Sequence, residues 1–114
     1  MGIKYVKVKK IPNILFFSTG NEITNKDKIL DWEVRNSISH YINSLNKNFL
    51  FNFKDGGILR DSQSNLFKSH INRMLKSKID LIITSGAVSA GKFDFVPSVI
   101  NNFKLSNYFK SVAI

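Results

Sequence analysis

The stretch that decides the fold is DLIITSGAVSAGKFDF, which covers residues 80–95 of a chain of 114 residues. An acidic residue leads into an apolar, β-branched run, and this pattern predicts a short strand that is buried on both faces. Small residues follow, and their glycines allow positive φ angles and a close approach of a ligand to the backbone. Asp94 then precedes apolar residues at helical spacing, an order typical of ligand sites at the carboxyl ends of strands in an open α/β sheet. The plainer interpretation of Asp94 is a helix N-cap.

Two further acidic residues follow predicted strands. The segment NILFFSTGNE (residues 13–22) has an apolar run that ends in Ser-Thr-Gly, with Glu22 two residues later, and Asp61 follows a glycine-bearing segment. In a parallel sheet, Glu22, Asp61 and Asp94 would therefore lie on one edge. Carboxylates gathered in this way suit Mg²⁺ together with substrate phosphates. The alternative is that two of these acids cap helices and the third is a solvated loop residue.

The pattern of apolar residues predicts the remaining elements. Helices are expected over residues 32–45, with Asp31 as N-cap, and over 66–75, with Asp61 or Ser62 as N-cap. Strands are expected at 14–17, 49–53, 81–83 and 109–114, with a turn at the glycine pair 56–57, and a helix begins near Asp94. This alternation predicts a three-layer α/β/α sandwich with a mostly parallel sheet, in which 14–17 and 81–83 are adjacent or nearly adjacent. Residues 1–10 are expected to be an edge strand or a linker from a preceding domain, and residues 11–114 the α/β domain.

The composition excludes several classes of protein. The net charge is +9, but all except three of the 17 basic residues are lysines spread along the chain, and no arginine-rich face of the kind that binds nucleic acid is apparent. The chain has no cysteine, which excludes disulfides and thiolate metal sites. No apolar run approaches the length of a membrane span, and the N-terminus lacks the apolar core of a signal peptide. We therefore expect a cytoplasmic protein without nucleic-acid or membrane partners.

Three motifs resemble one known family. The segments STGNEI (18–23), GILRD (57–61) and TSGAVSAGKFDF (84–95) are similar, in the same order, to motifs of the molybdopterin-binding domain of the MoeA and gephyrin E-domain family, and the resemblance covers residues 11–114. The sequence departs from the family pattern at three places. Asn21 replaces the commoner aspartate, Ala87 replaces the commoner glycine, and residues 36–38 read Asn-Ser-Ile where the family has Asp-Ser-Asn.

The resemblance implies a molybdopterin molybdotransferase. Such enzymes insert molybdate into the dithiolene of adenylylated molybdopterin and release AMP, with Mg²⁺ as cofactor. It implies that Glu22, Asp61 and Asp94 are the catalytic and metal-binding residues. The substrate-binding positions that it implies are Ser18, Thr19, Gly20, Asn36, Ser37, Thr84, Ser85, Gly86, Ser89 and Gly91.

The resemblance also implies that the chain is part of a longer architecture, with one domain before it and another after it. Family members form homodimers, and we expect a weaker dimer or a monomer here, with exposed apolar surface near residues 1–10 and 109–114. Transferase activity would then need the other domains. The alternative function is a non-catalytic fragment that binds molybdopterin or assists assembly, and the sequence leaves both open.

Overall fold

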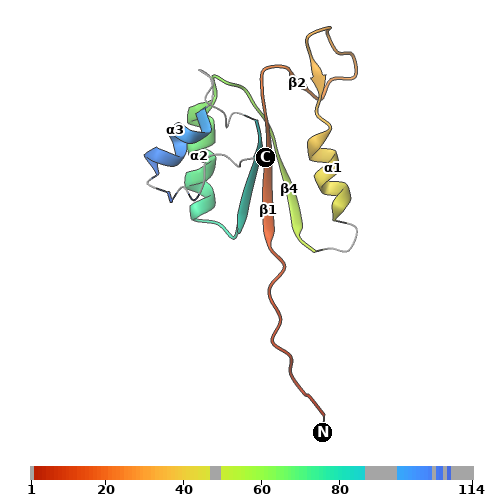
Figure 1. Cartoon of the computed structure of the whole chain (residues 1–114), viewed down its shortest axis with the longest axis vertical. Helices are drawn as coiled ribbons and strands as arrows, with labels where there is room; N and C mark the ends of the chain where they lie inside the picture. The colour runs from red at the N-terminus through yellow and green to blue at the C-terminus, as the bar shows by residue number, and fades with distance from the viewer. Residues whose placement is uncertain (1, 47–49, 87–94, 104, 107, 109–114) are drawn as a thin grey trace.

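The computed structural model of this chain describes residues 2–46, 50–86, 95–103, 105, 106 and 108. A central sheet contains β1 (Asn13–Thr19), β4 (Asn52–Leu59) and β5 (Leu81–Ser85). Helices α2 (Ser64–Leu75) and α3 (Phe95–Asn102) lie on one side of this sheet, and α1 (Ile38–Leu45) lies on the other (Figure 1). A small second sheet pairs β2 (Ile23–Thr24) with β3 (Val34–Arg35). The predicted α/β fold class is confirmed.

The three long strands are parallel and lie in the order β4-β1-β5. The predicted pairing of residues 14–17 with 81–83 is therefore confirmed, with Ile14 opposite Leu81. Strand β1 is buried along almost its whole length because it is the central strand. The expectation that β5 is buried on both faces is wrong, since its side chains are exposed or half-buried. Within the described residues β5 has a strand neighbour only on its β1 side.

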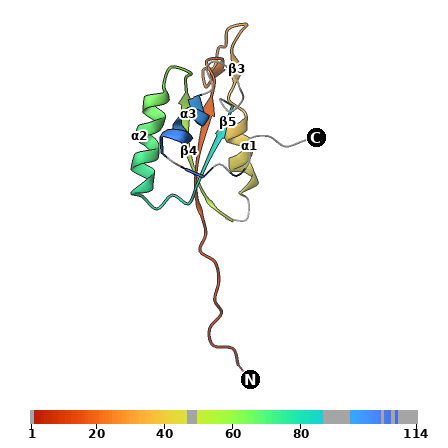
Figure 2. The ribbon, with the colours of Figure 1, turned by 60° about the vertical axis from the view of Figure 1, so that its left-hand side comes forward.

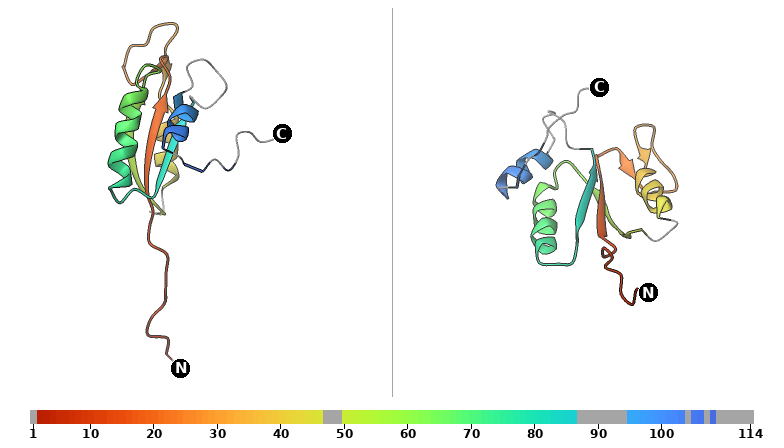
Figure 3. Two further views of the ribbon diagram at one scale, coloured as in Figure 1. Left: turned by 90° about the vertical axis from the view of Figure 1, so that its left-hand side faces the viewer. Right: turned by 60° about the horizontal axis from the view of Figure 1, so that its bottom comes forward.

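The apolar core lies between the sheet and the helices α2 and α3, which pack side by side on this face (Figures 2 and 3). Phe67 of α2 is its centre, with ring centroids 5.8 Å from Phe17 of β1 and 5.6 Å from Phe95 of α3, both at edge-on angles. Such aromatic pairs add about 0.5–1.5 kcal/mol each to the free energy gained from burial. The buried members of this core are Leu15, Phe17, Leu59, Phe67, Ile71, Met74, Phe95, Val96 and Val99.

The first helix begins later than the sequence predicts. Residues 34 and 35 form β3, and the helix starts at Ile38, so Asp31 is not its N-cap. The apolar residues are at helical spacing, but the first of them pair with another strand instead of forming a helix. The N–H of Val34 donates to the carbonyl of Glu22 (2.8 Å), and the N–H of Asn36 donates to the carbonyl of Thr24 (3.0 Å). A strand pairing between positions so far apart in sequence has no local signal.

Two predictions for the following segment are also wrong in part. The strand predicted at 49–53 is β4, which runs through the glycine pair to Leu59 without turning. Its register with β1 shifts where Gly56 and Gly57 lie opposite a single residue, and Gly57 has a φ of +89°, so the glycines form an irregularity within the strand. The helix predicted at 66–75 is confirmed as α2, but its N-cap is Gln63 and no side chain caps it.

Residues 2–12 contain no helix or strand, and their side chains are exposed. They leave the sheet at the start of β1 and extend away from the body of the domain (Figure 1). The strand predicted at 109–114 and the cap predicted at Asp94 lie outside the described residues.

Candidate functional site

The carboxyl ends of β1, β4 and β5 meet at one edge of the sheet, which we call the rim. The hydroxyl of Thr19 donates to the carbonyl of Ser85, and the N–H of Gly20 donates to the carbonyl of Leu59 (3.1 Å). Gly86 has a φ of +82°, and a Cβ at this position would lie 2.9 Å from the Thr19 hydroxyl oxygen. Only glycine fits this conformation and this spacing without strain. The rim therefore begins from a closely joined set of strand ends.

Asn21 and Asp61 are paired across the rim. The side-chain amide of Asn21 donates to Oδ2 of Asp61 (2.8 Å), and its carbonyl oxygen accepts from the N–H of Asp61 (3.3 Å). An aspartate at position 21, as in the family pattern, would place a second negative charge here and could not donate this bond. The departure at position 21 thus has a direct structural consequence: Asn21 orients the carboxylate of Asp61.

Arg60 joins the loop after β1 to the end of β4. Its Nη1 donates to the carbonyls of Gly20 (3.2 Å), Asn21 (2.5 Å) and Ile23 (2.9 Å). These carbonyls belong to the turn that carries Glu22. Arg60 therefore holds the backbone on both sides of Glu22, a role that sequence reasoning missed, although the residue lies next to Asp61 in the second motif.

The two described acids of the predicted triad are both at the rim. Glu22 is exposed, and both of its carboxylate oxygens are 2.6 Å from where a Cβ on Gly20 would lie. Asp61 is half-buried and held by Asn21. Carboxylates are the ligands that Mg²⁺ prefers, so the donor chemistry of these two side chains fits the ion. Among the described residues no group of three His, Cys, Asp or Glu side chains is arranged to bind a metal. Asp94, the third predicted acid, lies outside them, as do Ser89 and Gly91.

The hydroxyls of Ser18 and Thr19 bind the protein itself. Ser18 is buried and donates to Oδ1 of Asn36 at 2.7 Å. Thr19 donates to β5, as described above, and Thr84 and Ser85 belong to that strand and not to a loop. The hydroxyl protons of Ser18 and Thr19 are therefore donated to acceptors within the protein, and both residues hold the rim together.

Asn36 has one buried atom without a partner. The residue is only 6% exposed, and its amide nitrogen has no hydrogen-bond partner in the described part of the chain. It lines a pocket of about 600 Å³ together with Thr24, Asn25, Arg35, Ser37, His40 and Asp55. Ser37 precedes α1, and its side chain makes no capping bond. A buried amide without a partner costs free energy, and a ligand oxygen in this pocket would relieve that cost.

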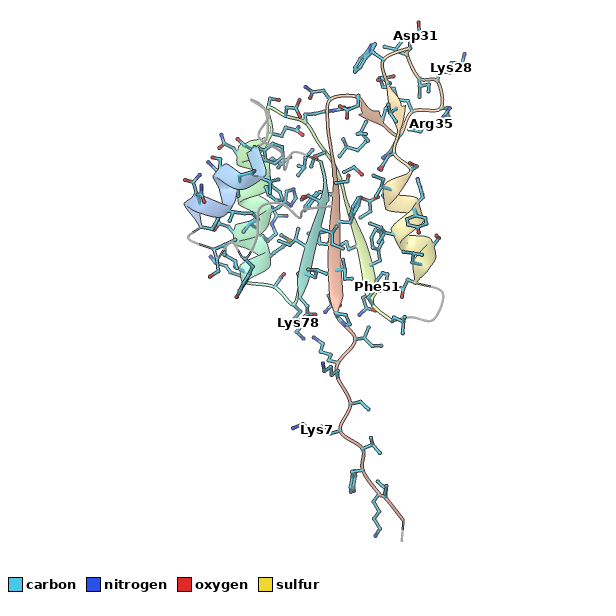
Figure 4. All side chains as sticks on the ribbon, in the orientation of Figure 1. Lys7, Lys28, Asp31, Arg35, Phe51 and Lys78 are labelled. Carbon is cyan, nitrogen blue, oxygen red and sulfur yellow. The ribbon has the colours of Figure 1, made fainter. Side chains whose placement is uncertain are left out.

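The segment between β1 and α1 (residues 20–37), which we call the excursion, is stabilised by Glu33. This buried carboxylate accepts from the N–H of Leu30 (2.9 Å) and pairs with the ammonium of Lys26 (2.9 Å). The Leu30 N–H, followed by Lys26, lowers the pKa of Glu33 below its usual value. Arg35 lies where the excursion meets α1 (Figure 4) and donates to the carbonyls of Lys26 and Asp27. The tip with Lys28 and Asp31 points away from the sheet.

These features define a class of protein. It is an α/β domain with acidic residues at the carboxyl ends of three parallel strands, where open sheets of this kind bind ligands. Residues 16–112 match the model of the family described as "Probable molybdopterin binding domain". The chain belongs to this family, and the resemblance drawn from the three motifs is confirmed.

Curated relatives agree with this assignment. The chain is 31% identical over 114 residues to "Molybdopterin molybdenumtransferase" of Staphylococcus epidermidis, a match that covers 98% of this chain and 26% of the relative. It is 30% identical over 115 residues to the protein of the same name from Staphylococcus aureus, covering 99% of this chain and 27% of the relative. The chain thus spans about a quarter of the length of these relatives.

A solved structure has the same fold. The molybdopterin biosynthesis MoeA protein from Pyrococcus horikosii matches with a TM-score of 0.60 and 20% identity, over 81% of this chain and 22% of that protein. In the described part of our chain, no helix has the length and apolar character needed to cross a membrane.

Proposed function

We propose that this chain is the molybdopterin-binding domain of a molybdopterin molybdotransferase and that its rim binds adenylylated molybdopterin, with molybdate as the second substrate. The match of residues 16–112 to the molybdopterin-binding family supports this most directly, and the site adds the pairing of Asn21 with Asp61. It holds a carboxylate at the point where three strand ends meet. Among the described residues the second oxygen of that carboxylate has no partner and is available to a ligand.

The acidic residues of the rim have related roles in this proposal. Asp61 and Glu22, with Asp94 as the third carboxylate, bind Mg²⁺, which supplies positive charge to neutralise ligand phosphate oxygens. Asn21 keeps Asp61 oriented, and Arg60 keeps the turn around Glu22 in place. The carboxylate of Asp61 and the backbone around Glu22 are therefore held before a ligand arrives, which lowers the cost of ordering the site on binding.

The remaining positions hold the ligand or the rim. The Asn36 amide donates to a ligand oxygen in the pocket that Ser37 also lines, and the Gly86 N–H donates to the ligand after the end of β5. Ser18 and Thr19 act as positioning residues, because their hydroxyls already donate within the protein. The other proposed ligand-binding positions are Gly20, Thr84, Ser85, Ser89 and Gly91.

The test is a calorimetric titration of adenylylated molybdopterin with and without Mg²⁺. We expect Asp61→Asn and Asp94→Asn each to weaken the Mg²⁺-dependent binding by about 1.5–3 kcal/mol, the scale of a hydrogen bond to a charged group. The substituted residue at 61 keeps an oxygen for the Asn21 amide, so the fold should be unchanged. Asp31→Asn is the matched control because Asp31 is exposed at the tip of the excursion, which points away from the sheet.

Equal binding by the wild-type chain and both rim variants, with and without Mg²⁺, would contradict the proposal. Because this chain spans about a quarter of its relatives, the titration addresses binding alone. Substitutions at the matching positions of a full-length relative then test the transfer step.

A further inference from the structure

A groove between α2 and β4 lies far from the rim. Its cavity of about 520 Å³ is lined by Asn13 and Asn52, the first residues of β1 and β4, and by Lys78, which lies just before β5. These positions are at the amino ends of the strands, whereas the rim is at their carboxyl ends. Figure 4 places Lys78 at the lower end of the sheet, opposite the excursion that carries Asp31. The groove is thus independent of the proposed molybdopterin site.

The floor of the groove is apolar. Phe53 and Ile79 give it half-buried surface, and the buried side chains of Leu15, Phe17 and Met74 border it. Gly56 of β4 lies directly against Phe17, because a Cβ at Gly56 would lie 2.3 Å from the ring. Any side chain on Gly56 would therefore displace the Phe17 ring or cover the floor. The absence of a side chain at position 56 adds nothing that would fill the groove, and its apolar lining is of the kind found in small-molecule sites.

The edges of the groove are positively charged. Lys54 of β4, Arg73 of α2 and Lys78 all line it, and in the described part of the chain none of the three forms a salt bridge. His70 is half-buried beside them with its ring centroid 5.1 Å from that of Phe17. Burial, followed by the charges of Arg73 and Lys54, lowers its pKa below the usual value.

One acidic residue, Asp55, borders the groove, and its carboxylate is hydrogen-bonded to groups that do not line the groove. The carboxylate of Asp55 accepts from the hydroxyl of Ser39 in α1, on the other face of the sheet, and from the N–H of Gly57. The lining thus carries three cations and one carboxylate, so the groove keeps an excess of positive charge. An anion with an apolar body would complement both features.

We propose that this groove binds a small organic anion, a carboxylate carried on an aromatic or branched aliphatic body. The cavity volume falls within the range of about 300–1,000 Å³ typical of small-molecule sites. The carboxylate lies among Lys54, Arg73 and Lys78, and the apolar body covers Phe53 and Ile79. The chain's own N-terminal segment does not suit the groove, because residues 2–12 carry four lysines that these cations repel.

The test is an NMR titration of the full 114-residue chain, labelled with ¹⁵N, with 3-phenylpropionate as the probe. Two further probes separate the contributions: 3-phenylpropan-1-ol has the same body without the charge, and propionate has the charge without the body. We expect amide shifts at Gly56, His70 and Arg73, with the carboxylate probe binding about fivefold or more tighter than the alcohol. This modest ratio is typical of exposed charges.

A pair of charge variants tests the position of the anion. Arg73→Gln should weaken binding of 3-phenylpropionate about two- to fivefold, the scale of one exposed ion pair. Lys76→Gln removes the same charge three residues further along the chain, at a position that does not line the groove, and should leave the affinity unchanged. Urea midpoints of both variants confirm that each is folded.

The outcomes are distinct. Equal affinity for the carboxylate and the alcohol, equal loss in both charge variants, or shifts only outside the groove would overturn the proposal. Its failure would leave the molybdopterin proposal untouched, since the two use different residues and different probes.

Discussion

The two faces of the central sheet are held by different kinds of interaction. On the α2 and α3 face, Phe67 packs edge-on against aromatic rings from β1 and α3 within an apolar core. On the α1 face, Ser39 is the only buried residue of the helix, and the links to the sheet include the hydrogen bonds Ser18–Asn36 and Ser39–Asp55. Phe16 and Phe53 add one stacked pair there. The first face thus holds most of the buried apolar side chains, and the other positions polar groups beside the rim.

The largest expected effect comes from a cavity in the apolar core between the sheet and the helices α2 and α3. Phe67→Ala removes a fully packed ring and leaves a cavity, so we expect the free energy of unfolding to fall by about 3–5 kcal/mol. Urea denaturation followed by circular dichroism measures this change. The matched control on the other face is Tyr41→Ala in α1, since Tyr41 is 64% exposed and its loss should change stability by less than about 0.5 kcal/mol. Similar losses in both variants would contradict the comparison.

The apolar face was also the part of the fold that the sequence predicted well. The hydrophobic runs of β1 and β5 and the helical spacing in α2 are local signals, and they led to the correct class, the correct strand neighbours and most of α2. The α1 side was predicted poorly. Its apolar residues Ile38, Tyr41 and Leu45 fit a longer helix, but all three are exposed, and the segment before them pairs with β2. Long-range strand pairing decided this region, and periodicity does not detect it.

The candidate site shows the same division. Glu22 and Asp61 were placed at one edge because each follows a strand, and the structure brings both to the rim. The hydrogen-bond partners that fix them were not predicted, since they depend on the distance between side chains in different loops. The sequence marks Asn21 only as a departure from the family pattern, because its bond to Asp61 joins residues 40 positions apart. The groove beside α2 has no sequence motif at all, because its lining comes from three separate segments.

A smaller effect is expected on the polar face. Asn36→Ala removes the acceptor of the buried Ser18 hydroxyl, and an unsatisfied buried group costs about 1–3 kcal/mol. The double variant Ser18→Ala with Asn36→Ala removes both partners and should recover part of this loss. Asn43→Ala, an exposed asparagine on α1, is the control and should be close to neutral. If the double variant is as unstable as the sum of the two single variants, the bond does not couple the two residues.

The smallest expected effect is a pH dependence that originates on the apolar face. His70 lies against Phe17. Burial is the largest cause that lowers the pKa of His70, and the charges of Arg73 on the same helix and Lys54 on β4 lower it further. Because its pKa in the folded chain is below the unfolded value of about 6.5, the unfolded chain binds the proton more readily. The free energy of unfolding should therefore be constant above pH 7 and fall as the pH drops below 6.5 through the folded pKa.

The lowered pKa of Glu33 acts only at lower pH, since its contribution is lost as the pH falls below the usual value of 4.5. Urea midpoints between pH 5 and 8 separate the two groups: His70→Gln should remove the slope in this window, and His40→Gln on the exposed side of α1 should retain it. A slope that persists in His70→Gln would mean that another group titrates in this range. The pH dependence of the free energy of unfolding would then not originate from His70.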